Sequence, residues 1–214
     1  MKLYSYFRSS AAYRVRIALN LKGLSYETVP VHLLKQGGQQ FSPEYRALNP
    51  MALVPTLIDG DFVLTQSLAI LEYLEETYPL PALLPSGAQD RARVRSIAQM
   101  IACDIHPLNN LRVLKYLKHE LKADEEARNA WYRHWVSQGL TAVEKVLVAS
   151  PQTGRYCHGD APSLADACLI PQVANARRLD CNLSGVPVIV RIDAACAKLP
   201  AFEQAAPARQ ADAE

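Results

Sequence analysis

Hydrophobic and polar positions in the first part of the chain switch between the spacing of short strands and that of helices. Residues 3–7 form a short aromatic-rich run, which predicts a strand. Residues 11–21 predict a helix, because Ser9-Ser10 supplies a favoured N-cap and Gly23 is typical of the residue after a helix end. A second strand is expected at residues 26–31.

The next apolar runs surround a strong turn signal. Residues 56–58 and 62–64 flank Asp59-Gly60-Asp61, and this spacing predicts a tight hairpin. Ser67 is expected to cap a helix over residues 68–77. Between the second strand and the hairpin the pattern is mixed. The order β-α-β followed by β-β-α predicts a compact α/β domain of about 80 residues.

Beyond the hairpin region the pattern becomes helical. Three prolines between residues 78 and 87 are typical of an interdomain linker. We therefore expect a first domain in residues 1–80, a linker in 81–87 and an all-helical domain in 88–214. Helices are expected at 88–121, 125–149, 163–179 and 187–199, the third starting with a Ser163–Asp166 capping box. The alanine-rich residues 205–214 are expected to fray.

Composition and charge narrow the class of protein without identifying its chemistry. The chain has 214 residues, and 23 Lys and Arg against 21 Asp and Glu leave a net charge of +2, which argues against a nucleic-acid partner. No apolar run reaches the roughly 18 residues of a membrane helix, and Arg8 comes too early for a secretory leader. The five cysteines contain no C-x-x-C pair, so no metal site is expected. We expect a cytoplasmic protein with buried, reduced cysteines.

Two junctions between a predicted strand and a predicted helix carry candidate anion-binding groups. Helix N-termini present unpaired N–H groups and a positive dipole, so a thiolate would be stabilised near Arg8, Ser9 and Ser10. Gln66 and Ser67 offer an amide and a hydroxyl that would suit a carboxylate. At both junctions the alternative is that the polar side chains only cap the helix.

The Val54-Pro55 pair precedes the predicted hairpin. A cis peptide bond here would turn the Val54 main chain outward as an edge to which an extended peptide could add. From frequency alone the trans form is favoured, since only about one X-Pro bond in twenty is cis.

Two polar stretches interrupt the helical half. Residues 103–112 place Cys103 and His106 on one face, but two ligands without a second cluster make a poor metal site, so a polar cleft lining is expected. Arg177 and Arg178 lie on a mostly apolar helix, where their forked donors would match a carboxylate. The alternative for either arginine is a solvated surface position.

The order of these motifs resembles the zeta class of glutathione transferases over nearly the whole chain. Residues 9–19 resemble the class signature S-S-C-x-x-R-V-R-I-A-L, with Ala11 in place of its cysteine. Further matching segments are residues 37–41, 49–51, 54–57, 66–70 and 171–176. The resemblance implies a thioredoxin-like α/β N-terminal domain, an all-α C-terminal domain, a homodimer and glutathione as a catalytic cofactor.

The resemblance also implies roles for individual residues. Ser9, with Ser10 beside it, resembles the hydroxyl donor to the glutathione thiolate. Glutathione contacts are implied for Gln40, Val54 before a cis Pro55, Gln66, Ser67, Asp104, His106, Asn110 and Arg112, with Asp104 reaching across the dimer. Arg8 and Arg178 resemble clamps for the carboxylates of a dianionic substrate. More broadly, five arginines are expected to converge on anionic ligands: Arg8, Arg14, Arg16, Arg112 and Arg178.

The activity implied is glutathione-dependent cis–trans isomerisation of maleylacetoacetate to fumarylacetoacetate in tyrosine and phenylalanine catabolism, by thiolate addition, bond rotation and elimination. Maleylpyruvate from gentisate degradation is the alternative substrate. Two other functions stay open: conjugation of glutathione to electrophiles in detoxification, and glutathione binding without catalysis. Because the signature cysteine is not the nucleophile, Ala11 is expected to leave isomerase activity intact.

Overall fold

The computed structural model describes residues 1–214 and divides them into two units. The first unit contains Met1–Leu83 together with Ala197–Glu214, and the second contains Leu84–Cys196. The division falls inside the stretch expected to be a linker. The end of the chain differs from the expected helical domain of residues 88–214, because everything from Ala197 onward groups with the first unit.

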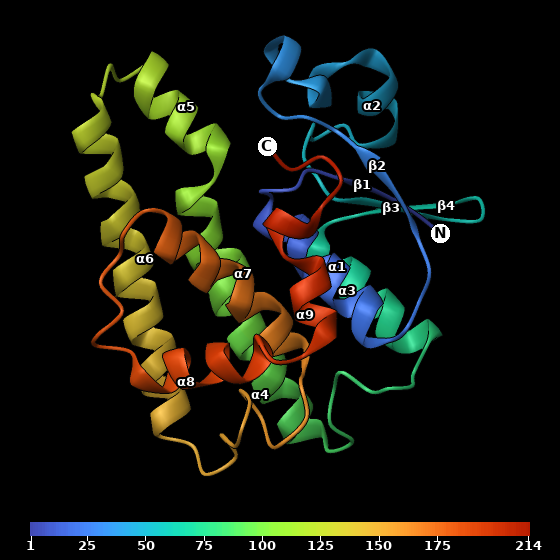
Figure 1. The fold of residues 1–214 in the computed structure, drawn as a ribbon, viewed down its shortest axis with the longest axis vertical. Helices are drawn as coiled ribbons and strands as arrows, with labels where there is room; N and C mark the ends of the chain where they lie inside the picture. The colour runs from blue at the N-terminus through green and yellow to red at the C-terminus, as the bar shows by residue number, and fades with distance from the viewer. The chain divides into compact units, whose positions relative to one another are not determined.

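A four-stranded mixed sheet forms the centre of the first unit (Figure 1). The strands are β1 (Lys2–Ser5), β2 (Glu27–Pro30), β3 (Thr56–Asp59) and β4 (Phe62–Thr65), in the order β2-β1-β3-β4. β1 pairs parallel with β2 and antiparallel with β3, while β3 and β4 form the predicted hairpin. The predicted β-α-β and β-β-α order, and with it the thioredoxin-like arrangement, is confirmed.

Helices of the first unit pack on one another as well as on the sheet. α1 (Ser10–Leu21) packs against α3 (Ser67–Thr77) and against α9 (Pro200–Ala205). A short helix, α2 (Pro43–Leu48), forms in the region of mixed pattern, where Ser42 accepts a hydrogen bond from the Tyr45 N–H and Pro43 occupies the first turn.

The residues that follow α9 do not fray, contrary to the prediction. Asp212 Oδ2 accepts a hydrogen bond from the Phe7 N–H at 3.0 Å, and Glu214 forms an ion pair with Lys35. The carbonyl of Ala205 accepts a hydrogen bond from the buried Arg16. The prediction was wrong because the alanine-rich composition does not reveal these partners, which come from elements near the N-terminus.

The second unit is all-helical, as predicted (Figure 1). Its helices are α4 (Ala88–Gln99), α5 (Leu111–His119), α6 (Glu125–Val148), α7 (Leu164–Arg178) and α8 (Pro187–Cys196). The predicted capping box at the start of α7 is present. Asp166 Oδ2 accepts a hydrogen bond from the Ser163 N–H at 2.8 Å, and the Ser163 side chain accepts one from the Asp166 N–H.

Residues 88–121 are not one helix. A π-helical turn at Met100–Ile105 and a 3₁₀ turn at His106–Asn109 separate α4 from α5. Pro107 lies in this break, and a proline in a helix interior removes one N–H donor and clashes with the preceding turn. The α-helical pattern therefore stops in the polar stretch that was expected to line a cleft.

All five cysteines are free thiols. Four of them are buried as expected, but Cys103 is exposed, so the expectation of burial was wrong for this residue. No group of three or more His, Cys, Asp or Glu side chains is arranged to hold a metal ion. No helix combines the length and the apolar character needed to cross a bilayer.

Candidate functional site

Each of the four strands in the sheet of the first unit has one end at the same edge of that sheet. Ser5, the last residue of β1, is in register with Pro30, the last residue of β2. Thr56, which begins β3, pairs with Thr65, which ends β4. Because Thr56 also pairs with Tyr4 of β1, all four ends lie together. This edge carries the predicted site residues of the first unit: Arg8, Ser9, Ser10, Gln40, Val54, Gln66 and Ser67.

Ser9 is the N-cap of α1 and retains a free donor. Its Oγ accepts a hydrogen bond from the Ala12 N–H at 3.2 Å. A serine hydroxyl has two acceptor lone pairs and one O–H donor, so this cap uses a lone pair and leaves the proton available. The capping role and the proposed thiolate-donor role are therefore compatible rather than alternatives.

The residues beside Ser9 differ in exposure. Arg8 is exposed, and its guanidinium lies 4.9 Å from the centre of the Phe7 ring. Ser10 is the first residue of α1 and is buried. Of the three polar residues at this junction, Ser9 is half-buried and Arg8 faces solvent, so these two are accessible to a ligand.

The N-terminus of α3 is organised differently from the prediction. Gln66, not Ser67, is the N-cap residue, and its side chain makes no capping hydrogen bond. Its φ of 70° lies in the left-handed region, which is uncommon for a residue other than glycine and clusters at ligand-binding positions. The buried Ser67 hydroxyl instead accepts a hydrogen bond from Arg14 at 3.1 Å. The first-turn N–H groups of α3 are thus left without a side-chain cap.

Val54 lies immediately before β3, and its bond to Pro55 is cis, as the family resemblance implies and contrary to the frequency argument. The Val54 side chain is buried in an apolar cluster with Tyr6, Phe7 and Tyr45. Any polar contact at this position must therefore come from the main chain of Val54.

Gln40 is buried in the short 3₁₀ turn Gln39–Phe41, and its Oε1 has no hydrogen-bond partner in the protein. Gly38 adopts a φ of 111°, and a Cβ atom there would lie 2.8 Å from both terminal atoms of the Gln40 amide. A side chain at position 38 would therefore displace Gln40. A buried amide oxygen without a partner is unfavourable unless a ligand or water supplies a donor.

The second unit holds the remaining predicted glutathione contacts around the break between α4 and α5. Asp104 and Arg112 are exposed, while His106 and Asn110 are half-buried. Asn110 is the N-cap of α5, and its Oδ1 accepts a hydrogen bond from the Arg112 N–H at 3.0 Å. π-helical turns inside α-helices occur frequently at functional sites, and Met100–Ile105 includes Asp104.

The two adjacent arginines of α7 have different partners. Arg177 forms an ion pair with Asp193. Arg178 donates a hydrogen bond to the Tyr132 hydroxyl at 3.4 Å and has no carboxylate partner. Burial raises the pKa of Tyr132, and the charge of Arg178 opposes that rise. Arg178 therefore keeps most of its guanidinium donors available, whereas Arg177 is engaged at the surface.

The expected cluster of five arginines is partly wrong. Arg16 is fully buried and donates to the carbonyl oxygens of Phe7 and Ala205 and to the Ser5 hydroxyl. Burial lowers the pKa of Arg16 to about 10. Arg14 is also buried, beneath Ser67. Both side chains organise the protein interior, so neither is accessible as an anion clamp.

Two features of this edge were not predicted from the sequence. Asp212 contacts the Phe7 main chain, and Gly38 is required by the Gln40 side chain. The adjacent glycines indicate a loop, but not which side chain packs over it. No local pattern connects Asp212 with Phe7.

Residues 1–76 match the family model of the glutathione S-transferase N-terminal domain. The chain is 52% identical over 211 residues to a probable maleylacetoacetate isomerase of Vibrio cholerae, covering 99% of this chain and 97% of that protein.

Two solved structures are similar over the whole chain. One is the holo structure of a maleylpyruvate isomerase, described as a bacterial glutathione transferase of the zeta class, with 51% identity and a TM-score of 0.97. The other is a maleylacetoacetate isomerase from Methylobacterium extorquens with bound malonate and glutathione, with 43% identity and a TM-score of 0.96. Both similarities cover 100% of each chain.

Proposed function

Because this chain belongs to the zeta class of glutathione transferases, the family of maleylacetoacetate and maleylpyruvate isomerases, we propose that it is a glutathione-dependent cis–trans isomerase of a maleyl dicarboxylate. The observation that carries the proposal is the Ser9 hydroxyl, which caps α1 with a lone pair and keeps its proton for a thiolate. Relatives over the full length support maleylacetoacetate and maleylpyruvate equally as substrates.

The residues of the first unit fit glutathione. Glutathione carries a carboxylate at each end, a peptide main chain and a thiol. The uncapped N-terminus of α3 suits a carboxylate, with Gln66 and Ser67 as its polar side chains. The main chain of Val54 suits the peptide, and the unpaired Oε1 of buried Gln40 suits an N–H donor.

When bound, glutathione supplies a thiolate that adds reversibly to the substrate double bond and allows rotation. The task of the protein is to keep that thiol deprotonated, since an alkyl thiol has a pKa of roughly 8.5. Ser9 donates a hydrogen bond from its hydroxyl to the thiolate sulfur, and the positive end of α1 favours the same negative charge. Each unit by which the pKa falls requires ~1.4 kcal/mol, which is within the reach of these interactions together.

Further contacts are proposed from the second unit and from Arg8. Asp104, His106, Asn110 and Arg112 contact glutathione, and Asp104 does so across the homodimer that we propose for this protein. Arg8 and Arg178 bind substrate carboxylates, because their guanidinium groups have no carboxylate partner within the chain. Both arginines would also stabilise the enolate charge that develops on the substrate. We propose a cytoplasmic location.

The direct test is isomerisation of maleylacetoacetate and of maleylpyruvate, followed spectrophotometrically with and without glutathione. We expect turnover of at least one substrate that depends strictly on glutathione. Equal rates with and without glutathione would contradict the proposal. Retention on glutathione resin without isomerisation or conjugation would instead indicate a non-catalytic binding protein, and conjugation of electrophiles alone would indicate a detoxifying transferase.

A further inference from the structure

The turn that carries Ser9 is stabilised by hydrogen bonds to residues outside the turn as well as by a hydrogen bond within it. The Ser9 N–H donates to the Tyr6 carbonyl at 2.9 Å, which closes a four-residue turn with Phe7 and Arg8 at its centre. The Phe7 N–H donates to Asp212 Oδ2 at 3.0 Å, and the Phe7 carbonyl accepts from Arg16 at 3.1 Å. The two polar groups of Phe7 are thus bound by groups of opposite charge.

Arg16 connects this turn to the end of the chain. Its Nε donates to the Ala205 carbonyl at 2.9 Å, while the same guanidinium binds Phe7. Burial lowers the pKa of Arg16, and Tyr26, Tyr13 and, to a smaller extent, the Asp212 carboxylate oppose that lowering. Asp212 therefore contributes in two ways, by a hydrogen bond to the Phe7 main chain and by its charge near the buried guanidinium.

We propose that Asp212 is a positioning residue that fixes the turn presenting the Ser9 hydroxyl to the thiol of glutathione. This inference rests on the proposed function. Loosening the turn by a fraction of an ångström weakens a charge-assisted hydrogen bond, whose strength depends on donor distance and angle. The consequence is a change in the pKa of the bound thiol, although Asp212 itself does not touch glutathione.

A purely electrostatic role predicts the opposite sign. Removing a negative charge near the site favours the thiolate and lowers the pKa of the bound thiol. Loss of positioning disfavours the thiolate and raises that pKa. Asp212→Ala removes both the charge and the acceptor, whereas Asp212→Asn removes the charge and keeps an acceptor oxygen for the Phe7 N–H.

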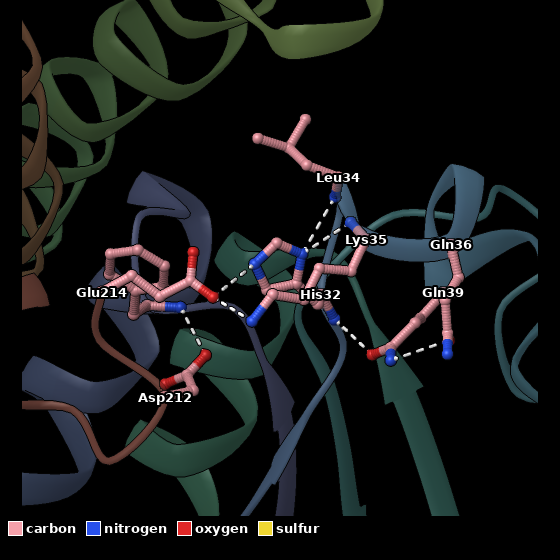
Figure 2. A network of polar contacts seen from close by, with 8 residues as sticks. His32, Leu34, Lys35, Gln36, Gln39, Asp212 and Glu214 are labelled. Carbon is pink, nitrogen blue, oxygen red and sulfur yellow. Dashed lines mark hydrogen bonds and ion pairs between the residues drawn. The ribbon is translucent and has the colours of Figure 1, made fainter.

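Glu214 provides a matched control on the same segment. It forms an ion pair with Lys35, and its Oε1 lies 3.5 Å from His32 Nε2 (Figure 2). His32 Nδ1 accepts from the Leu34 and Lys35 N–H groups, so Nε2 is the nitrogen that faces Glu214. The ion-pair partners of Glu214 are Lys35 and His32, neither of which belongs to the Ser9 turn, although the His32 ring packs against Tyr6. Such exposed ion pairs contribute little to stability.

The experiment is an ultraviolet titration of the thiolate of bound glutathione, with enzyme in excess, in the wild type and the three variants. We expect Asp212→Ala to raise the pKa of the bound thiol by about one unit, which is a roughly tenfold loss of thiolate at pH values well below the wild-type thiol pKa. Its kcat should fall in parallel and recover as the pH is raised. Asp212→Asn and Glu214→Gln should show no rise. Urea unfolding establishes that each variant is folded under the assay conditions.

An unchanged or lowered pKa in Asp212→Ala would overturn the inference, and so would an equal rise in Glu214→Gln. The titration needs glutathione alone, without a dicarboxylate. If the wild type lowers the pKa of the bound thiol but isomerises neither substrate, the proposed function is wrong. The role of Asp212 is then still decided by the titration alone.

Discussion

Replacing Ser9 separates the helix-capping role of this residue from its chemical role. The Oγ accepts from the Ala12 N–H at 3.2 Å, and the same hydroxyl is proposed to donate to the glutathione thiolate. Ser9→Ala removes both interactions. Ser9→Gly removes the hydroxyl, but glycine is itself an acceptable N-cap residue, and Ser9→Thr keeps both interactions.

The expected magnitudes follow from these two interactions. Loss of an N-cap hydroxyl to alanine costs about 1 kcal/mol of unfolding free energy, and replacement by glycine costs only a few tenths. A hydrogen bond to a charged group is worth ~1.5–3 kcal/mol. At ~1.4 kcal/mol per unit, losing it raises the pKa of the bound thiol by about one to two units.

Two measurements on the same three variants test this separation. Urea unfolding should place the wild type first, Ser9→Thr and Ser9→Gly a little below it, and Ser9→Ala last. Titration of the bound thiolate and kcat should instead group Ser9→Gly with Ser9→Ala, both roughly tenfold or more below the wild type in kcat at pH values well below the wild-type thiol pKa. If Ser9→Ala kept the wild-type thiol pKa and kcat while losing stability, Ser9 would be a helix cap and nothing more.

Three further substitutions test other parts of the structure. Lys22→Met should lower the unfolding free energy measured in urea by about 3–5 kcal/mol, because it leaves Glu75 buried without the ammonium that lies 2.7 Å away. A loss below about 1 kcal/mol, which is the range of exposed ion pairs, would mean that the pair is hydrated. Gly38→Ala should weaken glutathione binding in calorimetry by displacing Gln40, whereas Gly23→Ala, also at positive φ but with open space around its Cβ position, should leave affinity unchanged; equal effects would point to backbone strain instead. Arg178→Ala should raise KM for the dicarboxylate about tenfold or more while leaving KM for glutathione nearly constant. Arg177→Ala only breaks the pair with Asp193 and should match the wild type; if it raised KM for the dicarboxylate and Arg178→Ala did not, the roles of the two arginines would be exchanged.

The elements that could be read from the sequence are those stabilised by interactions between near neighbours in the chain. The hairpin around Gly60, the α1 cap at Ser9 and the Ser163–Asp166 capping box each depend on residues within a few positions of one another. Each was predicted in the right place. The helix expected over residues 88–121 failed because Pro107 lies inside a run whose other residues fit a helix.

The candidate site also has features that follow from near neighbours in the chain and features that depend on the tertiary structure. The family motifs locate Ser9, Gln40, Val54, Gln66 and Ser67 along the chain, but the register of four strands brings them to one edge of a sheet. The left-handed φ of Gln66 and the contact between Gly38 and Gln40 belong to that arrangement. Neither has a signature in the residue pattern.

The sequence by itself determined the order of the elements, the positions of the caps and turns, and the family to which the chain is similar. Only the tertiary structure decided that Arg16 is a buried scaffold residue and not an anion clamp, and that the end of the chain is anchored. The physical reason is distance along the chain. Asp212 and Phe7 are 205 positions apart, and a hydrogen bond between such residues depends on the whole first unit having folded. Local propensities act over a few residues, so they specify helices and turns but not the partners that those elements meet.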